Sequence, residues 1–378
     1  MGIFGKDFRD EYPYKIISSF ISKHADYKEN FHQSHTQYLN LKYKFEGHID
    51  SPKDVPETII LIIGEAARRS SMSLYGYSRK TTPLLDSLSA NNNHNFALFN
   101  NCYSASPFTR LSVPSMLSTS NTKDWYTLNT KPDIFRIFKA AGYHISFISN
   151  QSNLSFNDVD ISVLLKSSDK IVYLRKKKYL HDEKLLPYVF ESINSTATKK
   201  LIIVHLRGSH YEYTKSYPEE FTHWKGNNLV DAYDNSIRYS DNVIGKITDE
   251  IFKSEDNISI IYLSDHGENL NDFCDFNFGH GAKNFTRFEL EIPLVFIFNK
   301  RFQETKSSKI ETMFKYSSCL ISHDNLSHTI LGLADIYDKN YYNKKYDLCS
   351  QYFCVNDIYV MDKKLKIYPL NEIQFQKK

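Results

Sequence analysis

The chain runs through Ile258-Ser259-Ile260-Ile261-Tyr262-Leu263 and then directly into Ser264-Asp265-His266-Gly267-Glu268. The first six residues are mostly apolar and partly β-branched, which is typical of a buried strand. In open α/β sheets, ligands bind beyond the carboxyl ends of the strands. Asp265 and His266 are therefore predicted to lie at a binding site.

A second strand end carries a similar side chain. Glu65 follows the apolar run Thr58-Ile59-Ile60-Leu61-Ile62-Ile63-Gly64. Carboxylate oxygens and imidazole nitrogens are ligands that zinc and related cations accept in proteins. Glu65, Asp265 and His266 together make a metal site the working hypothesis.

Strand-like and helix-like runs alternate from Thr58 onward. The alternation predicts an α/β fold with a mostly parallel central sheet sandwiched by helices. We expect residues 1–55 to be a lead-in or linker segment and residues 56–378 to be one large domain. Strands are predicted at 58–63, 96–99, 144–149, 169–174, 200–205, 258–263 and 292–298, and helices near 83–90, 110–119, 132–141, 181–193, 229–254 and 324–333.

The composition sets limits on the class of protein. Of the 378 residues, 41% are hydrophobic, which is enough for a large core. The formal charge of 47 − 44 = +3 is too small to indicate a nucleic-acid surface, so we expect no nucleic-acid partner. The chain contains no apolar run of spanning length and no apolar signal core after Met1, so a transmembrane or signal segment is not expected within it.

The five cysteines are compatible with both a reducing and an oxidising compartment. They include no C-x-x-C pair, which argues against a zinc ribbon or a redox motif. Cys349 and Cys354 are close enough in sequence to pair under oxidising conditions, but five buried thiols are an equally good interpretation.

A hydroxyl nucleophile would complete the site, and the loop after residues 96–99 offers several hydroxyl groups. Thr109 lies just before a predicted helix, and a helix N-terminus stabilises an anion such as an alkoxide or a phosphoryl group. The alternative is that Thr109 or Ser112 is simply an N-cap.

The segment from Gly64 to Pro83, GEAARRSSMSLYGYSRKTTP, resembles the opening motif of bacterial phosphoethanolamine transferases, a branch of the alkaline phosphatase and sulfatase superfamily. Further matches follow in the same order, over about residues 58–335. They are Ser106-Pro107-Phe108-Thr109, Gly142-Tyr143 through Asn150-Gln151, Val204-His205-Leu206-Arg207-Gly208-Ser209-His210, Ser264-Asp265-His266-Gly267-Glu268, Phe278-Gly279-His280-Gly281 and Ser322-His323-Asp324-Asn325-Leu326-Ser327-His328-Thr329.

The resemblance implies one tight zinc site formed by Glu65, Thr109, Asp265 and His266, with a second metal as a further option. Thr109 would be the nucleophile. Zinc lowers the pKa of a bound water from 15.7 to about 7, and coordination should acidify a hydroxyl in the same sense. Attack on a phosphodiester would leave a phospho-threonine ester, which an acceptor then resolves.

Four more residues receive roles from the resemblance. His210 and His280 match histidines that contact the transferred phosphate or a second metal and move protons. Glu268 would orient His266 or bind a second metal, with an exposed loop carboxylate as the alternative. Asn150 would hydrogen-bond the phosphoethanolamine group.

The function implied is transfer of phosphoethanolamine from phosphatidylethanolamine to a lipopolysaccharide, in its core or lipid A, or to a related surface glycan. The loop at Thr109 more closely resembles that of transferases acting on the core. The place of action would be a membrane surface, the periplasmic face of the bacterial inner membrane. Residues 151–168 and 214–228 are candidates for the wall that selects the acceptor.

Members of the family carry an N-terminal membrane bundle, and this chain shows nothing like it. The chain is then either a soluble portion whose anchor was left off or a soluble protein that reaches its lipid in another way. The segment Tyr12-Pro13-Tyr14-Lys15-Ile16-Ile17 resembles the linker after the bundle, which favours the first option.

Other functions of the same superfamily remain as alternatives. They are a phosphodiesterase or other hydrolase and a phosphoglycerol transferase. A sulfatase is disfavoured because Cys102-Tyr103-Ser104-Ala105-Ser106 does not match the C-x-P-x-R pattern of that group. A catalytically dead module of glycan assembly is the alternative outside enzymes, and the complete set of four zinc-site residues argues against it.

Overall fold

The computed structural model describes residues 41–91, 94–152, 164–175, 180–226, 228–272, 279–281, 285–355, 357–373 and 375. Tyr43–Lys378 forms one unit. Most of the predicted lead-in segment, with the linker-like residues 12–17, lies outside the described residues. Within its last part, β1 (Gly47–Ile49) pairs antiparallel with β10 (Ile336–Asp338).

The central sheet has eight strands in the order β5-β4-β6-β2-β7-β8-β3-β9. Strand β8 is antiparallel to both its neighbours, and the other pairs are parallel, which confirms the predicted mostly parallel sheet. The strands are β2 (Glu57–Gly64), β3 (Phe96–Tyr103), β4 (His144–Ser152), β5 (Lys170–Arg175), β6 (Lys199–His205), β7 (Asn257–Ser264), β8 (Glu291–Phe298) and β9 (Leu320–Ser322).

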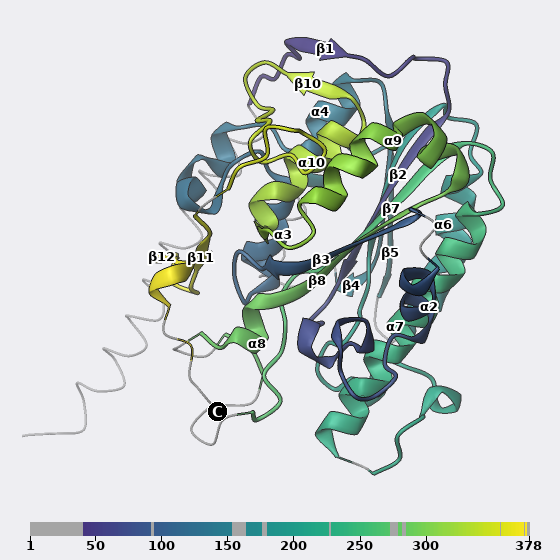
Figure 1. Cartoon of the computed structure of the whole chain (residues 1–378), viewed down its shortest axis with the longest axis vertical. Helices are drawn as coiled ribbons and strands as arrows, with labels where there is room; N and C mark the ends of the chain where they lie inside the picture. Colours follow the sequence, from purple (N-terminus) through teal and green to yellow (C-terminus); the bar gives the residue numbers. More distant parts are fainter. Residues whose placement is uncertain are drawn as a thin grey trace, which may run out of the picture. The chain divides into compact units, whose positions relative to one another are not determined.

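Helices cover both faces of this sheet, as predicted. In Figure 1, α2, α6 and α7 lie together on one side of the sheet, and α3, α9 and α10 lie on the other. Strands β2, β6, β7 and β8 are buried along their whole length, which explains why their sequences are continuous apolar runs. The helices are α2 (Pro83–Ala90), α3 (Thr109–Leu117), α4 (Ile134–Ala140), α6 (Leu186–Ile193), α7 (Leu229–Ile251), α8 (Arg287–Leu290), α9 (Lys300–Lys315) and α10 (Leu326–Leu333). A two-stranded sheet of β11 (Tyr359–Met361) and β12 (Ile367–Pro369) follows.

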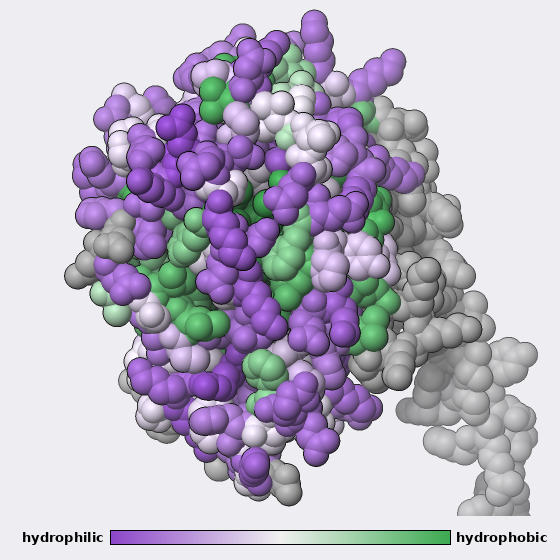
Figure 2. All heavy atoms as spheres, turned by 90° about the vertical axis from the view of Figure 1, so that its right-hand side faces the viewer, coloured by the Kyte–Doolittle hydropathy of each residue, from purple (hydrophilic) through white to green (hydrophobic). Residues whose placement is uncertain are grey.

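The long helix α7 buries an apolar stripe. Asn228 caps its start, because the Asn228 side chain accepts a hydrogen bond from the Asp231 backbone at 2.9 Å. Tyr233, Ile237 and Ile247 are at most 1% exposed. Figure 2 turns toward the viewer the side on which α2, α6 and α7 lie, and hydrophilic residues cover most of it.

The cysteines of the described residues are all free thiols. Cys102 is buried, but Cys354 is exposed, so the expectation of five buried thiols is wrong. Cys349 is partly buried and forms no disulfide with Cys354. Cys274 lies outside the described residues.

His328 on α10 makes the stability of the fold depend on pH. Its ring is 3% exposed, its Nδ1 accepts a hydrogen bond from the Asn343 backbone at 3.2 Å, and burial lowers its pKa from 6.5 to about 4. The unfolded chain therefore protonates His328 at a higher pH than the folded chain does. The contribution of the neutral His328 to the free energy of unfolding is complete above pH 6.5 and is lost as the pH falls toward 4.

We expect His328 to account for a loss of about 2 kcal/mol of unfolding free energy between pH 7 and pH 5. The variant His328→Gln keeps an acceptor for Asn343 but does not titrate, so its loss should be smaller by that amount. Urea unfolding at the two pH values measures the difference. Equal losses in the two proteins would refute the assignment.

Candidate active site

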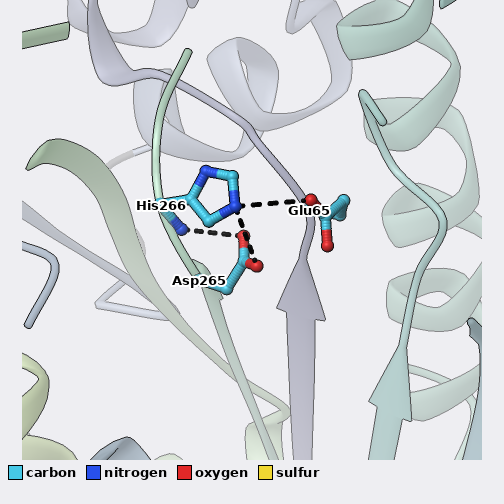
Figure 3. A group of neighbouring side chains, drawn as sticks. All are labelled: Glu65, Asp265 and His266. Atoms are coloured by element: carbon cyan, nitrogen blue, oxygen red, sulfur yellow. Dashed lines mark hydrogen bonds and ion pairs between the residues drawn. The ribbon is translucent and has the colours of Figure 1, made fainter. Parts of the chain in front are cut away.

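The site lies at the carboxyl ends of two neighbouring strands. Strands β2 and β7 are parallel partners, and Gly64 pairs with Ser264 at their last position. The next residues, Glu65 and Asp265, therefore leave the sheet side by side. Figure 3 shows Glu65 beside the end of β2 with the side chains of Asp265 and His266 turned toward it.

Thr109 meets these three side chains from helix α3. Its Oγ1 lies 2.6 Å from Asp265 Oδ2, 3.2 Å from Glu65 Oε2 and 3.3 Å from His266 Nε2. Thr109 is the first residue of α3, and the N-cap position belongs to Phe108, so the N-cap alternative for Thr109 does not hold. The structure thus brings together all four residues of the predicted zinc site.

Backbone contacts fix which atoms of Asp265 and His266 face the centre. Asp265 Oδ1 accepts hydrogen bonds from the Ala66 and His266 backbone amides, at 3.0 and 2.7 Å, which leaves Oδ2 toward Thr109. His266 Nδ1 is 2.8 Å from the Gly267 carbonyl and must donate to it. The lone pair of Nε2 therefore points at the carboxylates, and burial keeps the ring neutral by lowering its pKa to about 4.

The charge balance of this centre favours a bound cation. Burial, and after it the charge of Asp265, raise the pKa of Glu65 well above its ordinary value. Suitable oxygen and nitrogen atoms of Glu65, Asp265 and His266 all lie within 4.8 Å of one another. Two buried carboxylates and a neutral imidazole beside a hydroxyl are a donor set that fits zinc.

Two residues that the sequence did not single out join the loop carrying Thr109 to the end of β7. His323 Nε2 donates to the Ser264 carbonyl at 3.1 Å, and its Nδ1 accepts from the Ala105 backbone at 3.2 Å. Ser104 Oγ lies 2.6 Å from the Asp265 carbonyl oxygen. His323 is fully buried, and burial lowers its pKa to about 4, so the neutral ring that these two bonds need is present at pH 7.

Glu268 and His280 form a pair beside the zinc-site residues. Both Glu268 carboxylate oxygens lie within 3.3 Å of His280 Nδ1, and the His280 ring centre is 4.1 Å from that of His266. Glu268 is 1% exposed, so the alternative of an exposed loop carboxylate is wrong. Burial lowers the pKa of His280 and the bond to Glu268 raises it, with a net shift upward. The contact of Glu268 is with His280, whereas the sequence suggested His266.

His210 lies on the turn after β6 and is partly buried. Its Nδ1 is 2.5 Å from the Tyr211 carbonyl oxygen. Its charge contributes to the lowering of the pKa of His266, after burial and other larger causes, which places it near the centre. The role that the resemblance gives to His210 therefore stays a prediction.

Asn150 is enclosed by the protein. Its side chain is fully buried, and its amide nitrogen donates to the Leu180 carbonyl at 2.7 Å and to Asp182 at 2.8 Å. Asp182 also accepts from the backbone amides of Arg207 and Gly208, at 2.8 and 2.9 Å, so the pair supports the turn that carries His210. The expected bond from Asn150 to phosphoethanolamine stays a prediction, and Oδ1 is the atom of this side chain left to make it.

The neighbouring Gln151 lies at the site. Its Nε2 donates to Glu65 Oε2 at 3.1 Å and to the Leu206 carbonyl at 2.8 Å. Gln151 was part of a matched motif, but only the pairing of β4 with β6 shows which of its residues reaches Glu65.

Comparisons with known proteins identify relatives of this chain. The model of the family described as Sulfatase matches residues 57–336. The phosphoethanolamine transferase EptC of Escherichia coli is 31% identical over 274 residues, which are 68% of this chain and 47% of that protein. The Kdo(2)-lipid A phosphoethanolamine 7''-transferase of the same organism is 28% identical over 62% of this chain and 43% of its own length. The chain spans about half the length of the curated relatives it matches.

Solved structures show the same fold. The C-terminal periplasmic domain of EptC from Escherichia coli, in complex with zinc, has a TM-score of 0.79 and 28% identity, and the match covers 88% of this chain and 97% of that one. The integral membrane protein EptA from Neisseria meningitidis has a TM-score of 0.72 and 25% identity over 89% of this chain and 64% of that chain. Among the residues described here, none of the helices is long and apolar enough to cross a membrane.

Proposed function

This chain belongs to the sulfatase family, and from that membership and the geometry at Thr109 we propose that it is the catalytic part of a zinc-dependent phosphoethanolamine transferase. The donor is phosphatidylethanolamine. The acceptor is a lipopolysaccharide, in its core or lipid A, or a related surface glycan. The reaction takes place at the periplasmic face of the bacterial inner membrane.

One observation carries the proposal. The hydroxyl of Thr109 lies within 3.3 Å of a carboxylate oxygen of Glu65, a carboxylate oxygen of Asp265 and the Nε2 of His266. A threonine hydroxyl needs such an arrangement to become a nucleophile, because it is almost wholly protonated at neutral pH. Zinc held by Glu65, Asp265 and His266 would supply the positive charge that acidifies this hydroxyl.

In the first half-reaction Thr109 Oγ1 would enter as the alkoxide, its proton already lost to solvent, and it forms a bond with the donor phosphorus. The bond between phosphorus and the diacylglycerol oxygen breaks, and that oxygen takes a proton from a histidine at the edge of the site. His280, held by Glu268, is our candidate for this acid, and His210 is the second candidate. Diacylglycerol leaves, and phosphoethanolamine stays on Thr109.

The second half-reaction reverses these roles. A hydroxyl or phosphate oxygen of the acceptor attacks the phosphorus, the bond to Thr109 breaks, and the acceptor proton passes to the same histidine. Water in place of the acceptor would give hydrolysis, which is the activity of the alternative phosphodiesterase. The two activities differ only in what resolves the intermediate.

The experiment that separates them measures diacylglycerol release from phosphatidylethanolamine vesicles by zinc-loaded protein. We expect one equivalent of diacylglycerol per protein without an acceptor and continuous release when lipopolysaccharide is added. Phosphoethanolamine should appear on the lipopolysaccharide at the same rate. Continuous release without lipopolysaccharide, together with free phosphoethanolamine, would replace the transferase by a phosphodiesterase.

His323 should act on this chemistry only by positioning. We expect His323→Ala to weaken zinc binding by about 10- to 100-fold, the usual cost of losing a residue that orients a metal site, because the end of β7 loses its tie to the Thr109 loop. Competition with a fluorescent zinc chelator measures the affinity.

The matched control is His328→Ala. His328 is also buried and neutral, but its hydrogen-bond partner is the Asn343 backbone, which is not a residue of the site. This variant should lose stability and retain the zinc affinity of the original chain. Equal losses of zinc affinity in both variants would show that His323 has no specific positioning role.

A further inference from the structure

A cavity of about 650 Å³ lies between the loop that follows His210 and the start of α7. Its volume is in the range of small-molecule binding pockets, ~300–1,000 Å³. Its wall includes four aromatic residues, Tyr211, Tyr213, Tyr217 and Trp224. It overlaps the stretch 214–228, which the sequence suggested as a wall for the acceptor.

The cavity wall is held in place by buried polar contacts. Asn235 of α7 is 1% exposed, and its Oδ1 accepts from the His223 and Trp224 backbone amides at 2.9 and 3.0 Å. Its Nδ2 donates to the Trp224 carbonyl at 2.9 Å and to Tyr217 Oη at 3.4 Å. The loop that presents Trp224 is therefore ordered before any ligand binds, which lowers the entropy cost of binding.

The aromatic rings offer a stacking surface. Tyr211 is 56% exposed, and its ring packs edge-on against Tyr213 with centroids 5.9 Å apart. Trp224 is partly exposed, and the Arg79 guanidinium lies 5.4 Å from its ring centre. Rings of this kind pack against the C–H face of a sugar and leave the sugar hydroxyls free for polar neighbours.

The charges along the wall select against phosphate. The residues lining the cavity include acids but no lysine, arginine or histidine. Of the acids, Asp231 already binds Arg79 at 2.7 Å and the Gly226 backbone at 2.7 Å, and Glu212 pairs with Lys215. Glu219, the third acid of the wall, is exposed to solvent, so the buried carboxylate of the wall, Asp231, is already engaged and is not left over for an ammonium group. A neutral ligand rich in hydroxyls fits this surface better than a phosphate or a cation.

The cavity borders the active site through a short chain of contacts. The Tyr211 carbonyl oxygen lies 2.5 Å from His210 Nδ1. On the inner side, the Tyr213 ring packs on Tyr233 with centroids 5.1 Å apart, and Tyr233 donates its hydroxyl to the Ala66 carbonyl at 2.6 Å, next to Glu65.

We propose that this cavity is a sugar subsite that holds a neutral sugar residue of the glycan acceptor beside the reacting centre. The assignment of that sugar to the acceptor rests on the proposed transferase function. The proposal that the cavity binds a sugar does not rest on that function, because it follows from the cavity itself. Tyr211 supplies the stacking face, and Trp224 lies in the same wall.

The test uses Trp224 as a reporter of binding. The chain has two tryptophans, so Trp125→Phe leaves Trp224 alone. A dephosphorylated lipopolysaccharide core oligosaccharide is the probe, and it is titrated without any donor lipid. We expect a saturable change in Trp224 fluorescence, and at least ~10-fold weaker binding when Tyr211→Ala is added, because the sugar then loses the aromatic face on which it packs.

Tyr126→Ala is the matched control, because Tyr126 is also an exposed tyrosine, at 74%, but does not line the cavity. It should bind the oligosaccharide like the parent. No saturable change with the oligosaccharide, or a larger response to ethanolamine or inorganic phosphate, would overturn the subsite. If the oligosaccharide binds and phosphoethanolamine never appears on Thr109, the transferase fails and the sugar site stands.

Discussion

Replacing Thr109 by alanine is expected to reduce phosphoethanolamine transfer by about 10⁴-fold or more, to the background rate, because knocking out a nucleophile removes the covalent route entirely. The methyl side chain of alanine leaves Glu65, Asp265 and His266 in place, so zinc should still bind. Diacylglycerol release from phosphatidylethanolamine and zinc content, measured on the same sample, give the two results.

Thr109→Ser is the control for this variant. It keeps a hydroxyl at the first residue of α3 and should retain a measurable rate. A Thr109→Ala protein that still transfers phosphoethanolamine at more than a hundredth of the original rate would contradict a nucleophilic role for Thr109.

Replacing Asp265 by asparagine is expected to give the second large loss. The amide retains one oxygen, but the negative charge that faces Thr109 Oγ1 at 2.6 Å disappears. Zinc affinity should fall by at least ~100-fold, and transfer should fall with it, because this charge belongs to the metal site itself. Zinc content after dialysis and the rate at saturating zinc measure the two effects separately.

Asp241→Asn is the matched control for Asp265→Asn. Asp241 is also a buried aspartate that accepts two backbone hydrogen bonds, from Leu84 at 2.9 Å and Leu85 at 3.0 Å, but it lies on α7 away from the site. Its zinc content should equal that of the original chain. If both variants lost zinc equally, the loss would reflect damage to the fold and not to the site.

The sequence predicted the strands well wherever burial on both faces made them apolar. The strand predicted at 258–263 is Asn257–Ser264, and that predicted at 292–298 is Glu291–Phe298. The antiparallel direction of β8 was not predictable, because a fully buried strand has the same pattern in either direction.

The elements that the sequence missed have weak local patterns. Helix α9 is mostly polar and buries only Phe302, Lys306, Ile310 and Met313. Its best signal was Asn299, whose Oδ1 accepts from the Phe302 backbone at 3.0 Å as an N-cap. The three-residue strands β9 to β12 depend on their partners in space, which no local pattern reveals.

The sequence indicated which residues to consider for the site, but it did not indicate which side chains contact one another there. Strand ends marked Glu65 and Asp265, and the family resemblance supplied Thr109. The positions of Gln151 and His323 follow from which strands are neighbours, and sequence periodicity does not give that order. The prediction for Asn150 was limited in a similar way, because the motif that contains Asn150 does not reveal that its side chain is enclosed by the protein.

Mass spectrometry of the protein after incubation with phosphatidylethanolamine and zinc, without an acceptor, tests the covalent role of Thr109 most directly. The account predicts one phosphoethanolamine group per chain, located on the peptide that contains Thr109 and removed when lipopolysaccharide is added. The group should be absent from Thr109→Ala. An unchanged mass in zinc-loaded protein that releases diacylglycerol, or a group on a residue other than Thr109, would contradict it.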